Sequence, residues 1–134
     1  MPITIRNLQR KVRMDCPALQ RFAERALAKI PNHSLGEITV LLISDRRMAT
    51  LHRQFMDIAG PTDVITFQHG EIFISVETAK RNARRFHSSV EDEVKLYLVH
   101  GLLHLSGFDD KIAADAREME KAQARIIKST RRAV

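Results

Sequence analysis

The chain of 134 residues is 44% hydrophobic and 28% charged, a composition typical of a globular domain rather than of a disordered segment. The longest aliphatic run, residues 40–43, is far below the roughly 18 apolar residues of a membrane span, and the first residues lack the apolar stretch of a signal peptide. The single cysteine, Cys16, excludes an internal disulfide and predicts a cytoplasmic protein. The net charge of +6 predicts polyanionic partners rather than a membrane.

Strands and helices are predicted to alternate in the first half of the chain. An alternating apolar pattern indicates a strand at 3–8, and a helix over 15–30 follows, with a capping aspartate and a proline in its first turn. The run at 37–44 is apolar on both faces, which is typical of a central strand. Ser44 can cap the next helix, which continues through Phe55.

Two short strands, 63–67 and 71–75, are predicted before a helix over 76–86. The polar side of this helix is strongly basic, and it is either a solvated surface or a track for the phosphate backbone of a nucleic acid. The four basic residues on it are Lys80, Arg81, Arg84 and Arg85.

The last two predicted helices differ in polarity. One begins at Ser88 or Ser89, ends at Gly107 and becomes apolar on all sides after an acidic first turn, which predicts a buried helix. The other covers about 113–128 and has apolar residues at the spacing of a buried helix face. These residues are Ile112, Ala116, Met119, Ala122 and Ile126.

The order of the elements predicts an α+β fold, with a small mixed four-stranded sheet packed against about five helices. Neither a linker nor an internal repeat divides the sequence, so we expect one catalytic domain over residues 1–134. The end of the chain, residues 129–134, is expected to fray.

Two histidines on the apolar helix have the spacing of metal ligands. His100 and His104 are four residues apart, which places both imidazoles on one face of the helix. Gly107 can turn the chain back, so that the carboxylate of Asp110 approaches them. Two nitrogens and one oxygen, with a fourth position open, form the ligand set of a catalytic zinc site. We expect Asp110 to be the third ligand; the alternatives are a role for Asp109 and a site with two protein ligands.

The same spacing is similar to the H-x-x-x-H-x-x-G-x-x-H motif of the metzincin proteases, with Asp110 in the third ligand position. In those proteases a glutamate after the first histidine is the general base. Here that position is Gly101, which can neither accept nor donate a proton. A metzincin-like metalloprotease is therefore the second choice.

Three ordered motifs resemble those of the YbeY family of bacterial endoribonucleases. The family pattern H-G-x-L-H-L-x-G-[YF]-D-H is matched from His100 to Asp109. The pattern P-T-D-V-[LI]-[ST]-F is matched by residues 61–67, and G-[DE]-I-x-I-[SC] is matched by residues 70–75. The order of elements agrees with the family from about residue 38 to residue 127.

The resemblance implies a compact, zincin-like fold with the metal site on a buried helix. It implies one zinc ion per chain, held by His100, His104 and position 110, with a metal-bound water as the nucleophile. The implied substrate is single-stranded RNA, in small-subunit ribosomal RNA maturation and ribosome quality control, and a ribosomal protein or a GTPase is an implied partner. Asp63 matches a family position; it either accepts a hydrogen bond from a ligand histidine or caps a turn.

The sequence departs from the family pattern at two places. The family has a histidine where this chain has Asp110, and an anionic ligand should make a metal-bound water less acidic. Upstream, Met56 and Ile58 replace an arginine and a lysine, which removes two groups that could hold a phosphate. Arg53 is one turn earlier and could compensate in RNA binding. These departures leave a third reading open, a ribosome- or RNA-binding relative with weakened catalysis.

Overall fold

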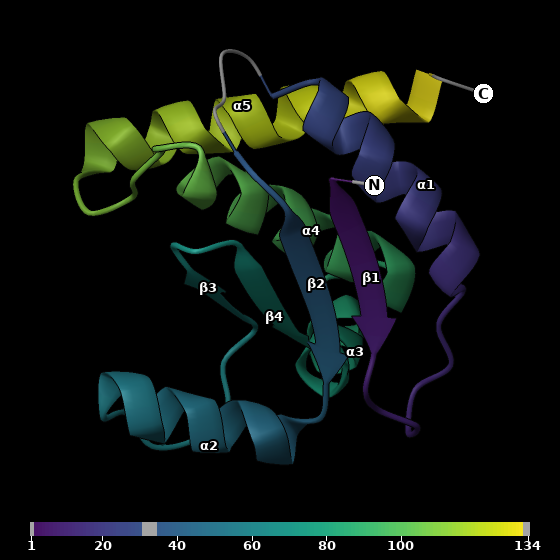
Figure 1. The fold of residues 1–134 in the computed structure, drawn as a ribbon, viewed down its shortest axis with the longest axis vertical. Helices are drawn as coiled ribbons and strands as arrows, with labels where there is room; N and C mark the ends of the chain where they lie inside the picture. The colour runs from purple at the N-terminus through teal and green to yellow at the C-terminus, as the bar shows by residue number, and fades with distance from the viewer. Residues whose placement is uncertain (1, 31–34, 133–134) are drawn as a thin grey trace.

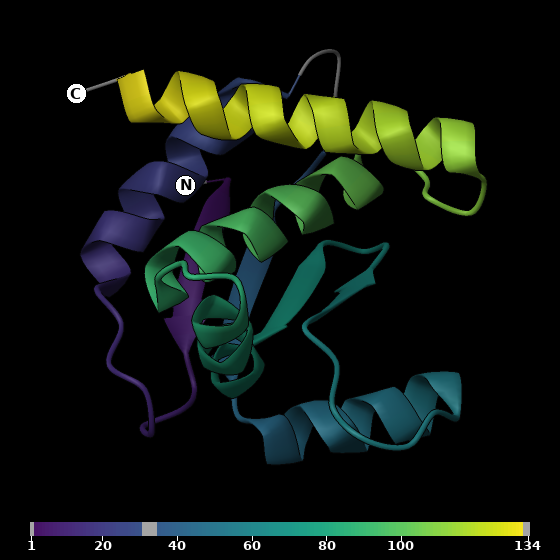
Figure 2. The same ribbon diagram turned by 180° about the vertical axis from the view of Figure 1, so that it is seen from behind.

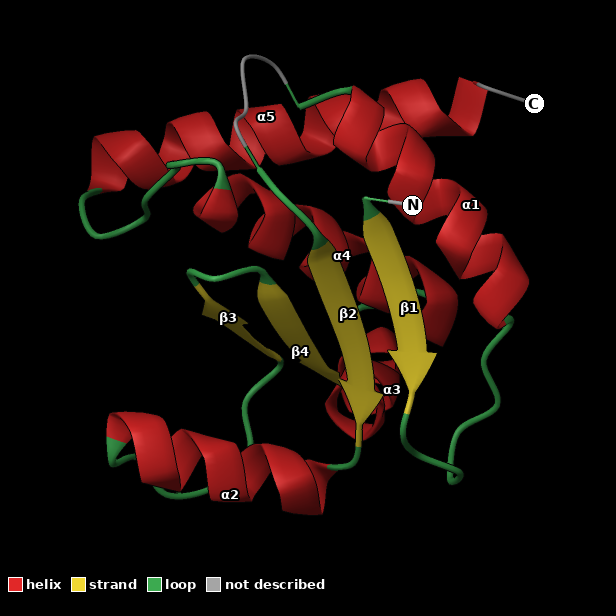
Figure 3. Ribbon diagram, viewed as in Figure 1, coloured by secondary structure: helices red, strands yellow, loops and turns green. Residues whose placement is uncertain are grey.

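Four strands form one mixed sheet in the order β1-β2-β4-β3 (Figure 3). In this computed structural model, which describes residues 2–30 and 35–132, the central strand β2 is parallel to both neighbours and β3 is antiparallel to β4. Each strand lies within one residue of the bounds predicted from its apolar pattern. The strands are β1 (Ile3–Asn7), β2 (Ile38–Ile43), β3 (Val64–Phe67) and β4 (Glu71–Ser75).

Five helices alternate with and follow the strands. They are α1 (Cys16–Ala28), α2 (Asp45–Met56), α3 (Val76–Arg85), α4 (Val90–Leu105) and α5 (Ala113–Arg132). Asp15, Ser44 and Ser75 accept hydrogen bonds from backbone N–H groups of the helices that they were predicted to cap. Ser89, rather than Ser88, caps α4. The predicted α+β fold, with a mixed four-stranded sheet and five helices, is confirmed.

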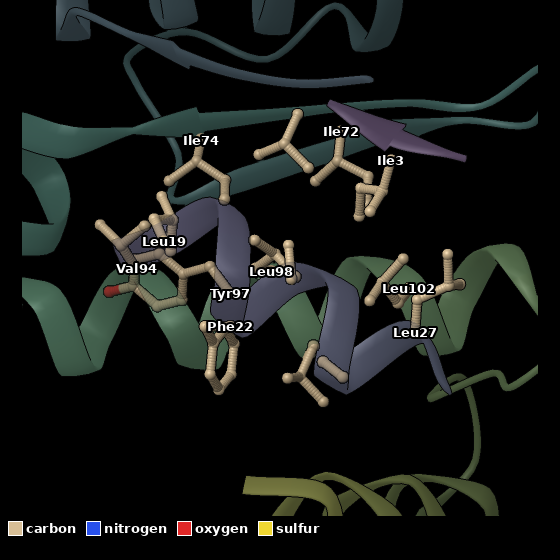
Figure 4. Close-up of a cluster of buried hydrophobic side chains, with 14 of the residues drawn as sticks. Ile3, Leu19, Phe22, Leu27, Ile72, Ile74, Val94, Tyr97, Leu98 and Leu102 are labelled. Atoms are coloured by element: carbon tan, nitrogen blue, oxygen red, sulfur yellow. The ribbon is translucent and has the colours of Figure 1, made fainter. Parts of the chain in front are cut away.

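The buried helix α4 packs on one face of the sheet and carries the candidate site. Leu98 and Leu102 of α4 face Ile72 and Ile74 of β4 in the main core (Figure 4). The remaining sides of α4 contact α1, α3 and α5 (Figure 2). Because α4 is enclosed by the sheet and by three helices, its sequence is apolar on almost every side.

The other face of the sheet is covered differently. Figure 1 shows this face, which α2 borders at one end. A second, smaller group of buried side chains forms here, which we call the outer cluster; it consists of Leu41, Ile43, Met48 and Ile65. Leu51, Phe67 and Phe73 pack against it and remain partly exposed.

The helix α5 differs from its prediction at both ends. It continues to Arg132, so residues 129–132, which we expected to fray, are helical; residues 133–134 lie outside the described part. The cause is tertiary packing, because Thr130 is only 4% exposed and α5 contacts α1. At the other end Ile112, expected on the buried face, is 60% exposed. Figure 2 shows the first turns of α5 extending beyond the end of α4, so the buried stripe begins only at Met119.

A carboxylate at the start of α2 ties this helix to α3. Asp45 accepts hydrogen bonds from the hydroxyls of Ser75 (2.6 Å) and Thr78 (2.7 Å) and from the Arg81 guanidinium. Partial burial alone would raise the pKa of Asp45, but the hydrogen bonds from Arg81, Ser75 and Thr78 outweigh it and hold the pKa below its usual range. Arg81 is therefore engaged in a structural ion pair.

We expect Asp45→Asn to lower the free energy of unfolding at pH 7 by about 1–3 kcal/mol, because charge-assisted hydrogen bonds are lost. The folded-state pKa of Asp45 is below its unfolded value, so its stabilisation is present above the unfolded pKa of about 3.9 and is lost as the pH falls through the folded pKa. Urea unfolding of both proteins at pH 7 and near pH 3 checks this. Glu120→Gln, on an exposed part of α5, is the control. An equal difference at the two pH values would contradict the prediction.

Candidate metal centre

The two predicted histidines lie together near the C-terminal end of α4. The Nε2 atoms of His100 and His104 are 3.1 Å apart, and the two ring planes cross at 80°. Both side chains are partly exposed, although the helix around them is buried. The i, i+4 spacing therefore places two imidazole nitrogens at one point on the surface of the helix.

The loop after α4 brings a carboxylate to the same point. Gly107 has a φ of +112°, and its N–H binds the carbonyl of His104, which turns the chain back as predicted. The Oδ2 atom of Asp110 then lies 3.8 Å from Nε2 of His104 and 4.0 Å from Nε2 of His100. Asp109 instead accepts hydrogen bonds from the backbone N–H groups that follow it. Of the two aspartates, the geometry brings Asp110 to the histidines.

The Nδ1 atoms of both histidines are already occupied by oxygen atoms. His104 Nδ1 lies 3.2 Å from the carbonyl of Phe108, which can only accept, so the ring donates from Nδ1. His100 Nδ1 lies 3.0 Å from Oε1 of Gln123 in α5. With these partners the neutral form of each ring carries its proton on Nδ1, which leaves Nε2 as the atom that can bind a metal.

Such an arrangement fits a bound metal ion. Two imidazole nitrogens and a carboxylate oxygen converge within 4.8 Å of one another. A cation at their centre would be coordinated by all three groups. Two histidines and one carboxylate, with the remaining side open, also form the donor set of known catalytic zinc sites.

The sequence did not predict a role for Gln123. For Asp63 it left two roles open, acceptor of a hydrogen bond from a ligand histidine or cap of a turn. The structure gives the partner role to Gln123 and to the Phe108 carbonyl. The Asp63 carboxylate accepts hydrogen bonds from the N–H of Val64 and the hydroxyl of Thr62, so it caps the start of β3. The available sequence signal for Gln123 was its position directly after Ala122, a residue on the predicted buried face of the last helix.

A hollow of about 330 Å³ opens beside the three groups. Met56, at the end of α2, and Asp63, before β3, form its other side together with β3 residues 64–66. A larger hollow of about 780 Å³ lies between α1, α4 and α5, but the cluster of potential metal ligands is not part of its wall. The smaller hollow is therefore the candidate active site.

Known proteins of one family resemble this chain over nearly its whole length. A sequence profile of the family described as Endoribonuclease YbeY matches residues 4–131. The chain belongs to the YbeY family. Endoribonuclease YbeY of Thermobifida fusca is 32% identical over 151 aligned positions, which cover 100% of this chain and 97% of the relative. The Cytophaga hutchinsonii YbeY is 38% identical over 105 positions, covering 72% of this chain and 73% of the relative.

A solved structure supports the same assignment at the level of the fold. The solution structure of TM1509 from Thermotoga maritima matches with a TM-score of 0.66 and 27% identity, over 96% of this chain and 88% of that one. As a YbeY protein the chain is a hydrolytic endoribonuclease with an RNA substrate, and this assignment replaces the metalloprotease alternative. No helix in the described part of the chain is long and apolar enough to cross a membrane.

The structure shows what the departures from the YbeY pattern do to the site. Met56, in the position of the family arginine, lines the hollow and is 47% exposed. Arg53 lines a different hollow, on the surface of α2, and its compensating role in RNA binding stays a prediction. Among residues 2–30 and 35–130, no lysine or arginine lines the candidate active site.

The basic residues predicted on α3 lie outside this hollow. Arg81 is held by Asp45. Lys80, Arg84 and Arg85 are exposed. Their role in RNA binding stays a prediction, and the geometry of the metal centre does not depend on them.

Gly101 explains why this YbeY site has no acid beside its first histidine. A Cβ atom at position 101 would lie 2.8 Å from Cγ2 of Ile72 and 3.2 Å from Cγ2 of Thr66. Because Ile72 is fully buried, it cannot move away freely. The close approach of α4 to β3 and β4 therefore requires glycine, and no glutamate fits.

We expect Gly101→Ala to lower the free energy of unfolding by about 1–2 kcal/mol, because overpacking at so close a contact costs about 2–3 kcal/mol before the gain in helix propensity is subtracted. Alanine has a helix propensity about 1 kcal/mol better than glycine, which opposes the loss without cancelling it. Gly36→Ala is the matched control, because a Cβ atom there meets no atom within 4 Å. Chemical denaturation of both variants checks the prediction, and a Gly101→Ala protein as stable as the wild type would contradict it.

We expect Gln123→Leu to reduce zinc affinity by about 10- to 100-fold, since it removes the acceptor that orients His100. Competition with a chromophoric chelator measures this affinity. Gln54→Leu, on the exposed side of α2, controls for loss of a surface amide. Equal affinities of Gln123→Leu and wild type would show that the Phe108 carbonyl and packing suffice to orient the pair.

Proposed function

We propose that this protein is a zinc-dependent endoribonuclease that cuts single-stranded RNA, with His100, His104 and Asp110 holding one zinc ion per chain. The observation that carries the proposal is the convergence of two imidazole nitrogens and one carboxylate oxygen beside an open hollow. Zinc bound there would lower the pKa of a coordinated water towards about 7 and so supply a nucleophile near neutral pH.

The residues of the chain have separate tasks in this proposal. His100 and His104 present their Nε2 atoms to the metal, with the ring orientations held by the contacts of their Nδ1 atoms with Gln123 and the Phe108 carbonyl. Asp110 supplies a negative charge, which lowers the net charge of the centre relative to a three-histidine site. The hollow between Met56 and β3 receives the RNA strand, and the overall charge of +6 favours its approach.

The proposed physiological substrate is small-subunit ribosomal RNA, in its maturation and in ribosome quality control, in the cytoplasm. The support is family membership together with the basic character of the chain. The ribosome is the proposed partner, and a ribosomal protein or a GTPase is a further one.

The test compares cleavage of a single-stranded RNA, its duplex and an unstructured peptide by the zinc-loaded protein. We expect cleavage of the single strand alone, loss of activity on chelation and recovery with added zinc. Cleavage that persists without metal would contradict the proposal. RNA binding without any cleavage would instead favour the catalytically weakened relative, which the apolar Met56 and the anionic Asp110 make the second candidate.

A further inference from the structure

Three phenylalanines and a histidine form a group on the outer face of the sheet, which we call the aromatic cluster. It consists of Phe55, Phe67, His69 and Phe73. The ring of Phe67 is central: its centroid lies 5.1 Å from that of Phe55 and 5.6 Å from that of Phe73, both edge to face. The His69 ring is stacked on Phe67 at 6.0 Å with an interplanar angle of 26°. The chain has only six phenylalanines, and half of them meet here.

Packing accounts for only part of this cluster. Phe67 and Phe73 contact the outer cluster and help to close it. Phe55, however, is 56% exposed, although it is a large apolar ring. Two further large apolar residues that closely follow Phe55 in the chain, Met56 and Ile58, are 47% and 50% exposed. Several large apolar residues exposed within a short segment are a feature of binding surfaces when they gather on one face.

The aromatic cluster adjoins the candidate active site along two elements. In α2, Phe55 immediately precedes Met56, which lines the hollow. In β3, Phe67 immediately follows Thr66, which also lines the hollow. Thr66 faces α4 and Phe67 faces the outer side of the sheet, because successive side chains of a strand point to opposite faces. An RNA strand whose phosphodiester lies at the metal centre would therefore reach these rings by passing over β3, which is the edge strand of the sheet.

The polarity of the residues around the hollow also indicates which ligand the aromatic cluster binds. Without a lysine or arginine in the described wall of the hollow, phosphate contacts contribute little to holding a strand there. Met56 and Ile58 occupy the positions of the family's arginine and lysine, so cationic groups are replaced by more apolar surface. Bases of single-stranded RNA stack on such surfaces, and aromatic rings accept them without sequence preference.

We propose that the aromatic cluster is a stacking platform for a base of the single-stranded RNA substrate beside the phosphodiester to be cut, with Phe55 as the ring that the base contacts. This inference rests on the proposed function and adds a substrate-positioning role for Phe55. The chain holds its substrate beside the metal centre by stacking, where the family pattern places charge.

The test measures binding of two dodecamers to the zinc-loaded protein by fluorescence anisotropy. One is 2′-O-methyl RNA with bases, and the other is the same backbone without bases. Their affinity ratio reports base contacts, because phosphate contacts are common to both strands. A gel of each sample verifies that the strands stay intact.

We expect Phe55→Leu to reduce this ratio about 5- to 150-fold, which corresponds to about 1–3 kcal/mol. The slope of log affinity against log salt should not change, since no phosphate contact is removed. Phe55→Tyr should retain the ratio. Phe86→Leu, which removes a 65% exposed ring at the end of α3, is the matched control and should also retain it. If Phe55→Leu is less stable than wild type, Phe55→Met serves as the second non-aromatic variant.

An affinity ratio unchanged in folded Phe55→Leu and Phe55→Met would overturn the platform and leave the surface to a protein partner. The outcome is separate from that of the proposed function. A ratio that falls in Phe55→Leu supports the platform even if the wild type cuts no RNA. Wild-type cleavage with an unchanged ratio rejects the platform alone.

Discussion

Replacing His104 with alanine is expected to abolish stoichiometric zinc binding and to reduce RNA cleavage by about a thousandfold or more. The Nε2 atom of His104 lies closest to both other candidate ligands, at 3.1 Å from His100 and 3.8 Å from Asp110. Without it only one imidazole and one carboxylate remain. Loss of several kcal/mol of metal-derived charge stabilisation corresponds to about three powers of ten in rate.

Metal content by mass spectrometry and initial cleavage rates, measured on the same samples, check this expectation. His87→Asn is the control, because His87 is exposed on the α3–α4 connection and asparagine tolerates its φ of 55°. A folded His104→Ala protein that keeps about one zinc ion per chain would refute the assignment of His104 as a ligand. Retained zinc with lost cleavage would indicate instead that His104 acts on the substrate.

Local patterns were sufficient to predict most of the secondary structure. Ser44 and Ser75 each stand where a strand ends and cap the helix that follows. Each serine therefore marked both the end of a strand and the start of a helix. The apolar character of α4 on all sides predicted its burial, because only an enclosed helix can be apolar all round. The pair His100 and His104 needed nothing beyond the helical period.

Features that depend on contacts between distant segments could not be predicted in the same way. Gln123 binds His100 across 23 positions, and nothing near either residue specifies that α5 passes there. The end of α5 was misplaced because burial of Thr130, rather than helix propensity, extends the helix. The tight approach at Gly101 depends on Ile72 of β4. The sequence therefore showed that glycine stands in place of the metzincin glutamate, but it could not show why.

The aromatic cluster is a further example of long-range assembly. The chain has one tyrosine and no tryptophan, so its composition by itself does not point to a base-stacking surface. The pairing of β3 with β4 and the packing of α2 bring Phe55, Phe67 and Phe73 together from three elements. The number of aromatic residues was therefore a poor guide to their local density.

Removing the carboxylate of Asp110 is expected to lower zinc affinity by more than about 100-fold, beyond the 10- to 100-fold typical of residues that only orient a ligand. Asp110→His should restore full zinc occupancy, since histidine is the residue of the family pattern at this position. Because the neutral imidazole raises the net charge of the centre, its bound water should ionise more readily. We therefore expect Asp110→His to reach half-maximal cleavage at a lower pH than the wild type.

Chelator competition and pH–rate profiles of the two variants and the wild type provide the measurement. Asp109→Asn is the matched control, because it alters the neighbouring carboxylate while keeping an oxygen for the N–H groups of Asp110 and Lys111. Unchanged zinc affinity in Asp110→Ala would mean that the centre has only two protein ligands. An unshifted pH profile in Asp110→His would mean that the carboxylate stays outside the coordination sphere, because only a ligand changes the charge at the metal directly.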